Sequence, residues 1–396
     1  MSASTTLVVG AGFGGIAAAR RLRTLLPSEH RVLVVDRRSE VTLGAGLTWV
    51  LLGRREPKHV TRRLSGLSRH GIEFRCAEVV AVNPASRRVD VAGDRVQADA
   101  LVLAPGAQLT LEPLPGAAGV AHQFYELDAA LRLREALAGF RGGRIVVTVI
   151  APPYKCPAAP HEACLLLYER LTQTLGPGSF TICFVTPEPQ PMPVAGATVG
   201  ATVRALYEER LIRTRFGVKP RRVHSPTATP AGSPPMRPVA GELELSDNSR
   251  EPFDLLIVVP AHGAPAFLRN TGLLGENGWV TVERGTLATR FENIWAIGDV
   301  AHVPLANGGM LPKAGVFARA EGEVVAGAIA ARLLGKPEAA AFDGRGGCFL
   351  ETGAGEAAYV EGEFFTEPAP TVTLAAPSKT GLAGKERFAA DWRRMY

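Results

Sequence analysis

The chain has 396 residues, 46% hydrophobic and 21% charged, which is ordinary globular composition with enough length for two or three domains. Its formal net charge is +6 and its pI is about 9.2, but the basic residues are scattered, so we predict no nucleic-acid binding. Every apolar run is broken well before the roughly 18 to 20 residues that span a bilayer, so no transmembrane helix is predicted.

The N-terminus, "MSASTTLVVGAG", enters its first strand within a few residues, which leaves no room for a secretory signal. We therefore expect a cytoplasmic protein, in which thiols stay reduced. It has five cysteines: Cys76, Cys156, Cys164, Cys183 and Cys348. None belongs to a CxxC or to a Cys/His cluster with zinc spacing, so no metal site is predicted.

The first motif is "TTLVVGAGFGGIAAARRLRTLL", an apolar strand, a glycine turn and a helix with small residues on one face. The glycines have G-x-G-x-x-G spacing, which permits a tight turn, close approach to a pyrophosphate and close helix packing. The start of the following helix offers amide donors to phosphate oxygens. The predicted dinucleotide contacts here are Gly10, Gly12, Phe13, Gly14 and Gly15.

The next strand, "HRVLVVDR", ends in Asp36 and Arg37. Asp36 lies about 20 residues beyond the glycines, where a carboxylate binds a ribose hydroxyl pair. Further on, "ADALVLAPGA" is an apolar strand that ends in a small-Pro-Gly turn, and its residues Ala104, Pro105 and Gly106 are further candidate contacts.

The middle of the chain repeats this plan. The segments "RIVVTVIA", "SFTICFVTP" and "FDLLIVVPAHGAP" correspond to the three strands above, which predicts a second nucleotide-domain copy in tandem with the first. Its turn is "PPYKCPAAPHEA", with four prolines and no glycine. Prolines supply neither the amide donors nor the positive φ angles that such a turn needs. We expect weak or absent NAD(P)H binding, although Glu188 stands where it could hold a ribose.

Three later segments complete the organisation. Residues 224–241 are rich in Pro, Ala and Ser, which indicates a surface loop within the second domain. The segment "TRFENIWAIGDVA" is an apolar strand that ends at Gly298 and Asp299. Beyond Gly335 come Gly-punctuated strands and then "GKERFAADWRRMY", a predicted helix with Phe388, Trp392 and Met395 or Tyr396 on one face.

The glycine turn, the "ADALVLAPGA" segment and the Gly-Asp segment together resemble the flavoprotein disulfide reductase superfamily, in which the aspartate matching Asp299 binds the ribityl chain of FAD. The segments "GLTWVLLGRR", "YKCPAAPHEA", "LPKAGVFARAEGEVVAGAIAARLLG" and "GGCFLETGAGEAAYVEGEFF" resemble the sulfide:quinone oxidoreductase and flavocytochrome c sulfide dehydrogenase family. The resemblance implies an α/β fold with two tandem Rossmann-like domains and a small C-terminal α+β region. We expect an FAD-binding domain from 1–107 and 288–337, a second domain from 108–287 and a C-terminal interface or acceptor region from 338–396.

The resemblance also implies that Cys156 and Cys348 form a redox-active pair facing the flavin. A helix start and Lys155 would lower the pKa of the Cys156 thiol, whereas Cys76, Cys164 and Cys183 fit inert buried positions. By the same resemblance, Lys313 and Ala314 would approach the flavin pyrimidine ring; a solvated surface lysine is the alternative. His161, Glu162 and His302 are candidate proton carriers, with structural hydrogen bonding as the alternative for each.

This chain lacks the third cysteine of one branch, in "AGVAHQFYELDAA", and any cysteine in "EVTLGAG", so we expect FAD to be non-covalent. A quinone acceptor follows from the resemblance alone, with possible walls at Phe349, Phe364, Phe365, Trp392 and Tyr396. The C-terminal helix either rests on an anionic membrane surface, on the inner face of the cell membrane, or packs in the interface of the expected homo-oligomer.

The leading hypothesis is therefore an FAD-dependent enzyme that oxidises sulfide or a persulfide through Cys156 and Cys348 and reduces a quinone. Two alternatives remain: an NAD(P)H-dependent flavin reductase of the type II NADH dehydrogenase or disulfide reductase kind, and a non-catalytic flavoprotein subunit. The missing second glycine turn argues against the first alternative, and the missing export signal argues against a flavocytochrome partner for the second.

Overall fold

The first sheet takes its strands from distant parts of the chain. The computed structural model describes residues 4–226, 235–337 and 340–396. Five parallel strands lie in the order β20-β9-β1-β2-β5: β1 (Thr5–Val9), β2 (Arg31–Asp36), β5 (Glu73–Cys76), β9 (Ala100–Leu103) and β20 (Ile294–Ala296). Strands β9 and β20 are buried along their whole length, as expected for a parallel sheet covered on both faces. The sheet is therefore complete only when β20 joins β9.

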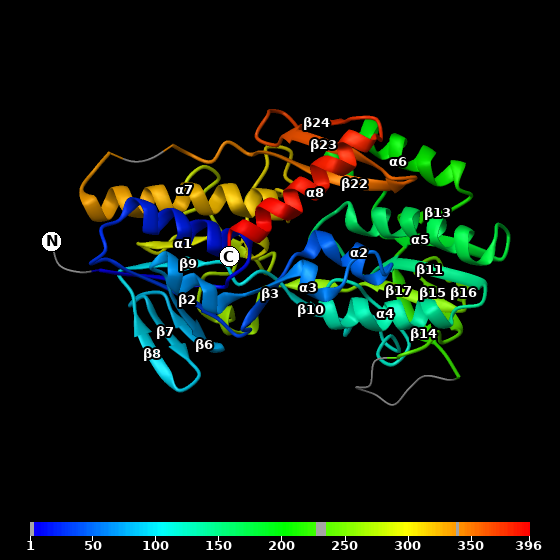
Figure 1. The fold of residues 1–396 in the computed structure, drawn as a ribbon, viewed down its shortest axis with the longest axis horizontal. Helices are drawn as coiled ribbons and strands as arrows, with labels where there is room; N and C mark the ends of the chain where they lie inside the picture. Colours follow the sequence, from blue (N-terminus) through cyan, green and yellow to red (C-terminus); the bar gives the residue numbers. More distant parts are fainter. Residues whose placement is uncertain (1–3, 227–234, 338–339) are drawn as a thin grey trace.

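Two helices lie side by side on one face of this sheet, α1 (Phe13–Leu25) and α7 (Gly315–Leu334) (Figure 1). Their close approach depends on glycine, because a Cβ at Gly14 would lie 2.9 Å from the carbonyl oxygen of Ala318, and a Cβ at Gly322 would overlap the carbonyl oxygen of Gly14. An antiparallel sheet lies across the first sheet from these helices (Figure 1): β6 (Val79–Asn83), β7 (Arg88–Val91) and β8 (Asp94–Gln97).

The second sheet repeats the strand order of the first. Its parallel strands lie in the order β17-β11-β12-β13: β11 (Gly143–Val149), β12 (Phe180–Thr186), β13 (Arg213–Phe216) and β17 (Leu255–Val259). The order matches β9-β1-β2-β5, so the internal duplication read from the sequence is present in the topology. Around this sheet lie α4 (Leu127–Gly139), α5 (Ala159–Leu175), α6 (Ala197–Glu209) and an antiparallel sheet of β14 (Pro220–His224), β15 (Gly241–Leu245) and β16 (Arg250–Phe253).

The C-terminal region is an antiparallel sheet with one helix: β22 (Arg345–Gly353), β23 (Glu356–Glu363), β24 (Thr371–Leu374) and α8 (Lys379–Arg394). The side chain of Ser378 accepts a hydrogen bond from the amide of Gly381 and so caps α8. The remaining elements are short: β3 (Glu40–Thr42) with β4 (Thr61–Arg63), α2 (Leu47–Leu51), α3 (Pro57–Val60), β10 (Gln108–Thr110) with β18 (Ala261–Gly263), and β19 (Val280–Thr281) with β21 (Ala301–His302).

The fold class predicted from the sequence is confirmed, while the exact domain boundaries stay a prediction. Helix α8 begins five residues before the Gly384 expected from the sequence, because Ser378 supplies the cap. Within the predicted loop at 224–241, residues 227–234 lie outside the described part of the chain. The expectation that Cys76 is buried is wrong: it ends β5, an edge strand, and is exposed. Among the described helices, none combines the length and apolarity needed to cross a membrane.

Candidate active site

The glycine turn after β1 has the geometry of a dinucleotide site. Gly10 has a φ of 100°, and a Cβ at Gly10 or Gly15 would overlap backbone oxygen atoms. Around Gly12, by contrast, a Cβ would meet nothing within 4 Å. No side chain caps the start of α1, and its first turn holds no acidic residue. Open space therefore lies beside Gly12 at the uncapped start of α1, and the positive dipole end of the helix there suits an anionic pyrophosphate.

Asp36 stands beside this turn at the end of β2. Its Oδ2 accepts a hydrogen bond from the amide of Ala11 at 2.9 Å, and its Oδ1 accepts one from the amide of Arg38 at 2.9 Å. These bonds hold the carboxylate where a ribose would be bound. The neighbouring Arg37, also predicted as a contact, is exposed.

The other predicted cofactor residues meet the same turn from β9, β20 and α7. Ala104, in the turn after β9, faces Gly10, because a Cβ at Gly10 would overlap the Ala104 carbonyl oxygen; Pro105 and Gly106 follow it. The Gly298 amide donates to Oε2 of Glu321 at 2.5 Å. Ala314 is the N-cap of α7, which has no side-chain cap and no acidic residue in its first turn. Two uncapped helix starts, those of α1 and α7, thus lie in this region.

Lys313 is buried rather than solvated. Its Nζ donates to the carbonyl oxygens of Asp299 at 2.7 Å and Ala301 at 3.1 Å, and it lies 3.6 Å from the centroid of the Trp279 ring. Burial lowers the pKa of Lys313 to about 8, an effect that Asp299 partly opposes. The surface-lysine alternative is therefore wrong, and Lys313 fixes the turn before α7 against the Gly-Asp segment.

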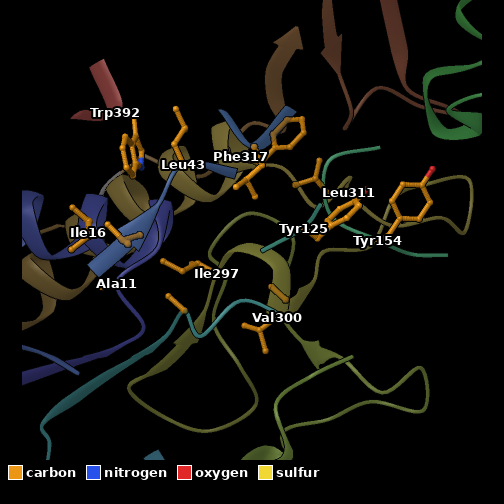
Figure 2. Close-up of a cluster of buried hydrophobic side chains, with 14 of the residues drawn as sticks. Ala11, Ile16, Leu43, Tyr125, Tyr154, Ile297, Val300, Leu311, Phe317 and Trp392 are labelled. Carbon is orange, nitrogen blue, oxygen red and sulfur yellow. The ribbon is translucent and has the colours of Figure 1, made fainter. Parts of the chain in front are cut away.

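Buried side chains from distant segments line this region. Figure 2 shows Ala11 and Ile16 near the glycine turn, with Trp392 of α8, at one end of the cluster. Tyr125 and Tyr154 lie at its other end. The glycine turn, Asp36 and the uncapped helix starts fit a flavin dinucleotide, whose phosphates, ribose and ring need these partners.

Helix α8 closes the glycine-turn end. Phe388 stacks on Phe13, with ring centroids 5.6 Å apart and an interplanar angle of 13°. Trp392 is 1% exposed, and the hydroxyl of Tyr396 donates to the carbonyl oxygen of Ala11 at 3.1 Å. The predicted apolar face of this helix therefore packs inside the chain.

The second strand-to-helix turn presents Cys156 in an unusual backbone conformation. Cys156 has a φ of 55°, which is uncommon for a residue other than glycine and tends to occur at functional sites. Its amide donates to the carbonyl oxygen of Lys313 at 2.7 Å, and its own carbonyl accepts from the amide of Ala159 at the start of α5. The turn is thereby tied to the region that carries the predicted flavin contacts.

A tyrosine of the same turn forms a hydrogen bond with the Glu188 carboxylate. The hydroxyl of Tyr154 donates to Glu188 Oε2 at 2.8 Å, and the hydroxyl of Thr186 donates to the same oxygen at 3.1 Å. Glu188 is 7% exposed, and its burial raises its pKa. The carboxylate that could have held a nicotinamide ribose is thus buried beneath a tyrosine.

A buried ion cluster lies beside the thiols and was not foreseen from the sequence. Lys385 Nζ on α8 donates to Glu162 Oε1 at 2.6 Å and to Glu351 Oε2 at 2.9 Å. All three side chains are 5% exposed or less. Glu162 also accepts from the Thr48 hydroxyl at 2.7 Å and the Glu351 amide at 2.9 Å. Glu351 accepts from Trp49 and Arg54. The cluster thus joins α2, α5, β22 and α8.

The two predicted redox cysteines share one electrostatic environment. Burial raises the pKa of Cys156 to about 11; Glu162 adds to the rise, while Lys385 and the Ala159 amide oppose it. Burial also raises the pKa of Cys348, and Cys156 and Glu162 add to that rise. The sequence predicted a lowered pKa for Cys156, because the helix start is visible in a sequence and burial is not. Both thiols therefore keep their protons at neutral pH.

The structure also shows the surroundings of three other predicted residues, His161, His302 and Lys155. His161 is fully buried, and its Nδ1 lies 2.7 Å from the Tyr207 hydroxyl, with its ring against Phe184. Burial lowers its pKa to about 3, so the geometry favours the structural alternative for His161. His302 lies on β21, where burial lowers its pKa. Lys155, the predicted activating cation, lies 5.9 Å from the centroid of the Tyr125 ring.

Comparison with known proteins supports the class of oxidoreductases that the sequence motifs resemble. Residues 4–149 match the family "Pyridine nucleotide-disulphide oxidoreductase". The solved structure of the sulfide:quinone oxidoreductase from Aquifex aeolicus superposes with a TM-score of 0.87 at 21% identity, covering 99% of this chain and 92% of that one. The chain is thus an oxidoreductase with the two-domain fold of this class, for which a flavin is the implied cofactor.

The names of its relatives describe a more specific activity than the family description does. The mitochondrial sulfide:quinone oxidoreductase of Mus musculus is 24% identical over 379 residues, covering 92% of this chain and 79% of the mouse protein. The chain is a homologue of the sulfide:quinone oxidoreductases, and the resemblance stated from its motifs is confirmed. An alternative NAD(P)H-ubiquinone oxidoreductase of Arabidopsis thaliana is 29% identical over 188 residues, which covers only 41% of this chain and 36% of that protein.

Proposed function

We propose that this protein is an FAD-dependent enzyme that oxidises sulfide or a small persulfide through Cys156 and Cys348 and delivers two electrons to a quinone. The observation that carries the proposal is the turn at Cys156. In a fold with two nucleotide-domain copies, the second copy has Cys156 in the turn where the first has glycines, and the Cys156 amide donates to the carbonyl oxygen of Lys313. The relatives named as sulfide:quinone oxidoreductases support the substrate and the acceptor.

FAD, held non-covalently, would supply the two-electron acceptor for the thiol pair. The glycine turn would hold its pyrophosphate and Asp36 its adenosine ribose. Gly298, Asp299 and the start of α7 at Ala314 would hold its ribityl and ring portions. None of these assignments needs a covalent bond to a cysteine.

The thiol chemistry begins with the pair oxidised to a disulfide. Hydrosulfide attacks one sulfur of the Cys156–Cys348 bond, which breaks as a new S–S bond forms, giving a persulfide on one cysteine and a thiolate on the other. Burial disfavours charge at both positions, so a thiolate left there is held at high free energy and is a strong electron donor. Lys385 is the cation that opposes this penalty at Cys156.

Glu162 is the proposed proton carrier for this pair. Its carboxylate lies in the first turn of α5, three hydrogen-bond donors hold it in place, and its charge acts on both cysteines. The proton of the entering hydrosulfide and those of the reduced thiols need an acceptor within this buried site. Glu162 is the predicted carrier whose charge acts on both cysteines, and this supports the proposed role.

The quinone is proposed from kinship with the relatives, and the burial of the predicted wall residues supports one direction of approach. Of the predicted walls, Phe364, Trp392 and Tyr396 are buried in the core. Phe349 and Phe365 are only partly buried, and Phe349 neighbours Cys348 in β22. We propose that a quinone approaches along the Phe349 side, with α8 beside it. The cytoplasmic location, the membrane contact and the homo-oligomer stay predictions.

The NAD(P)H-dependent alternative is disfavoured by the Tyr154–Glu188 hydrogen bond, which occupies the ribose-binding carboxylate. The test is to mix the anaerobic, flavin-loaded protein with sulfide or with NADH. Sulfide should bleach the flavin, and Cys156→Ser and Cys348→Ser should each abolish this bleaching. Cys76→Ser, which changes the exposed cysteine at the end of β5, is the matched control and should bleach normally. Rapid bleaching by NADH alone would refute the proposal.

A further inference from the structure

Two buried polar atoms in the second domain lack hydrogen-bond partners. They are the hydroxyl of Tyr125 and Nε2 of His262, and neither has a partner within residues 4–226, 235–337 and 340–396. Their rings meet edge to face, with centroids 5.3 Å apart. Tyr125 is only 5% exposed. An unsatisfied buried polar group costs about 1–3 kcal/mol, so a neighbouring pair points to a ligand that satisfies both.

The protonation of each atom follows from its surroundings. Nδ1 of His262 lies 2.8 Å from the carbonyl oxygen of Pro260, which can only accept, so Nδ1 carries the ring hydrogen and Nε2 is an acceptor. Burial, together with the charge of Lys155, lowers the pKa of His262 to about 3, so the ring is neutral. Burial raises the pKa of Tyr125, so its hydroxyl keeps its hydrogen and can donate.

A cation completes the set. Lys155 lies over the Tyr125 ring, with Nζ 5.9 Å from the centroid. In the described part of the chain, Lys155 forms no ion pair within 4.0 Å. The three groups come from the loop before α4, from β18 and from the turn before α5, which are elements of the second domain. The residues that fit the flavin come mainly from the first domain.

The set lies next to the thiol. Lys155 adjoins Cys156 in the chain, and the charge of Cys156 contributes to the raised pKa of Tyr125. The ring centroids of Tyr154 and His262 lie 6.5 Å apart. Cys156 is also among the groups that raise the pKa of Tyr154, after its burial. A ligand bound by these groups would therefore lie close to Cys156, the proposed reacting cysteine.

We propose that Tyr125, His262 and Lys155 form a subsite that binds hydrosulfide before it attacks the cysteine pair. The charged sulfur would accept from the Tyr125 hydroxyl and face the Lys155 ammonium, while its own S–H would donate to His262 Nε2. A halide offers no hydrogen to His262, and neutral hydrogen sulfide makes no use of the cation. The match is thus to a small anion that still carries a proton. This inference rests on the proposed function for its choice of ligand.

The test uses equilibrium binding, without turnover. The flavin-loaded Cys156→Ser/Cys348→Ser variant is titrated anaerobically with sodium hydrosulfide at neutral pH and followed by calorimetry. Adding Tyr125→Phe, or Lys155→Met in case the first substitution impairs folding, should raise the dissociation constant about 10-fold or more, as expected for a lost hydrogen bond or charge contact to an anion. Tyr168→Phe, which changes a tyrosine packed on Phe180, is the matched control and should leave binding unchanged.

Unchanged hydrosulfide binding in both variants would overturn the proposal. So would weakened FAD retention in Tyr125→Phe with unaltered hydrosulfide binding, because the two orphan atoms would then be partners of the cofactor. The proposed function fails separately, if sulfide does not bleach the wild-type flavin. Tyr125-dependent binding in the thiol-free variant would support the subsite even then.

Discussion

Replacing Lys385 by methionine removes the cation from the buried cluster beside the thiols. Glu351 would keep its bonds to Arg54 and Trp49, but Glu162 would keep only neutral donors, the Thr48 hydroxyl and a backbone amide. Leaving one buried charge uncompensated costs about 3–5 kcal/mol. For a chain of 396 residues, that corresponds to a melting temperature lower by roughly 4–6 °C.

The assay is thermal unfolding of the flavin-loaded protein followed by circular dichroism. Lys379→Met removes an exposed lysine of the same helix and should shift the melting temperature little. Adding Glu162→Gln to Lys385→Met should restore most of the loss, because the orphaned charge is then gone. Since Glu162 and Glu351 raise the pKa of Lys385, its stabilisation persists across neutral pH and is lost only as pH rises through that raised value.

A second readout connects the cluster to the thiols. Lys385 opposes the rise in the pKa of Cys156, so its removal should slow alkylation of the reduced Cys156 by iodoacetamide at a given alkaline pH. If Lys385→Met melts like Lys379→Met and alkylates like the wild type, the cluster does not act as described, and the reasoning from its geometry is wrong.

Three further changes test other parts of the structure. Gly15→Ala should prevent folding, because its Cβ would overlap the Gly10 carbonyl oxygen. Gly12→Ala should fold, because its Cβ enters open space, but it should lose FAD affinity by about 10-fold or more, because that space is the proposed pyrophosphate site. Soluble yield measures the first effect, and flavin release followed by fluorescence measures the second. Burial raises the pKa of Glu321 to about 7 from 4.5, so the folded state binds more protons between these values and stability falls as pH rises through them. Glu321→Gln should flatten the dependence of melting temperature on pH, and the exposed Glu323→Gln should not; equal slopes in all three proteins would contradict the assignment. Tyr154→Phe should remove a bond to Glu188 and lower stability by about 1–3 kcal/mol without creating NADH oxidation, because no glycine turn is present; measurable NADH turnover would show that the tyrosine alone blocks that site.

Much of the first nucleotide site could be predicted because its signals are local. Gly10, Gly12 and Gly15 lie within one turn, and Asp36 stands at a fixed distance along the next strand. The duplication was visible because each copy repeats the same strand-turn-helix order. Short-range patterns of this kind survive in a single sequence, since one turn or strand end determines them.

The cluster around Lys385 was missed because it is built from four elements far apart in the chain. One signal was present: Lys385 stands three residues before Phe388, on the same helical face as the apolar residues assigned to the core. A lysine on that face needs a buried carboxylate partner. The direction of the Cys156 pKa shift was missed for a related reason, because it depends on the burial that those distant elements create.

Helix α8 is the last element of the chain to be synthesised, and this affects when the glycine turn becomes covered. A ribosome releases the glycine turn long before β20 and α7, and only later α8, whose Phe388 and Trp392 pack over that turn. Domains tend to fold as they emerge, N-terminal parts first. The glycine turn, β20 and α7 are therefore all synthesised before the helix that packs over the turn. The docking of α8 therefore covers the glycine turn and brings Lys385 to Glu162 and Glu351 in the same step.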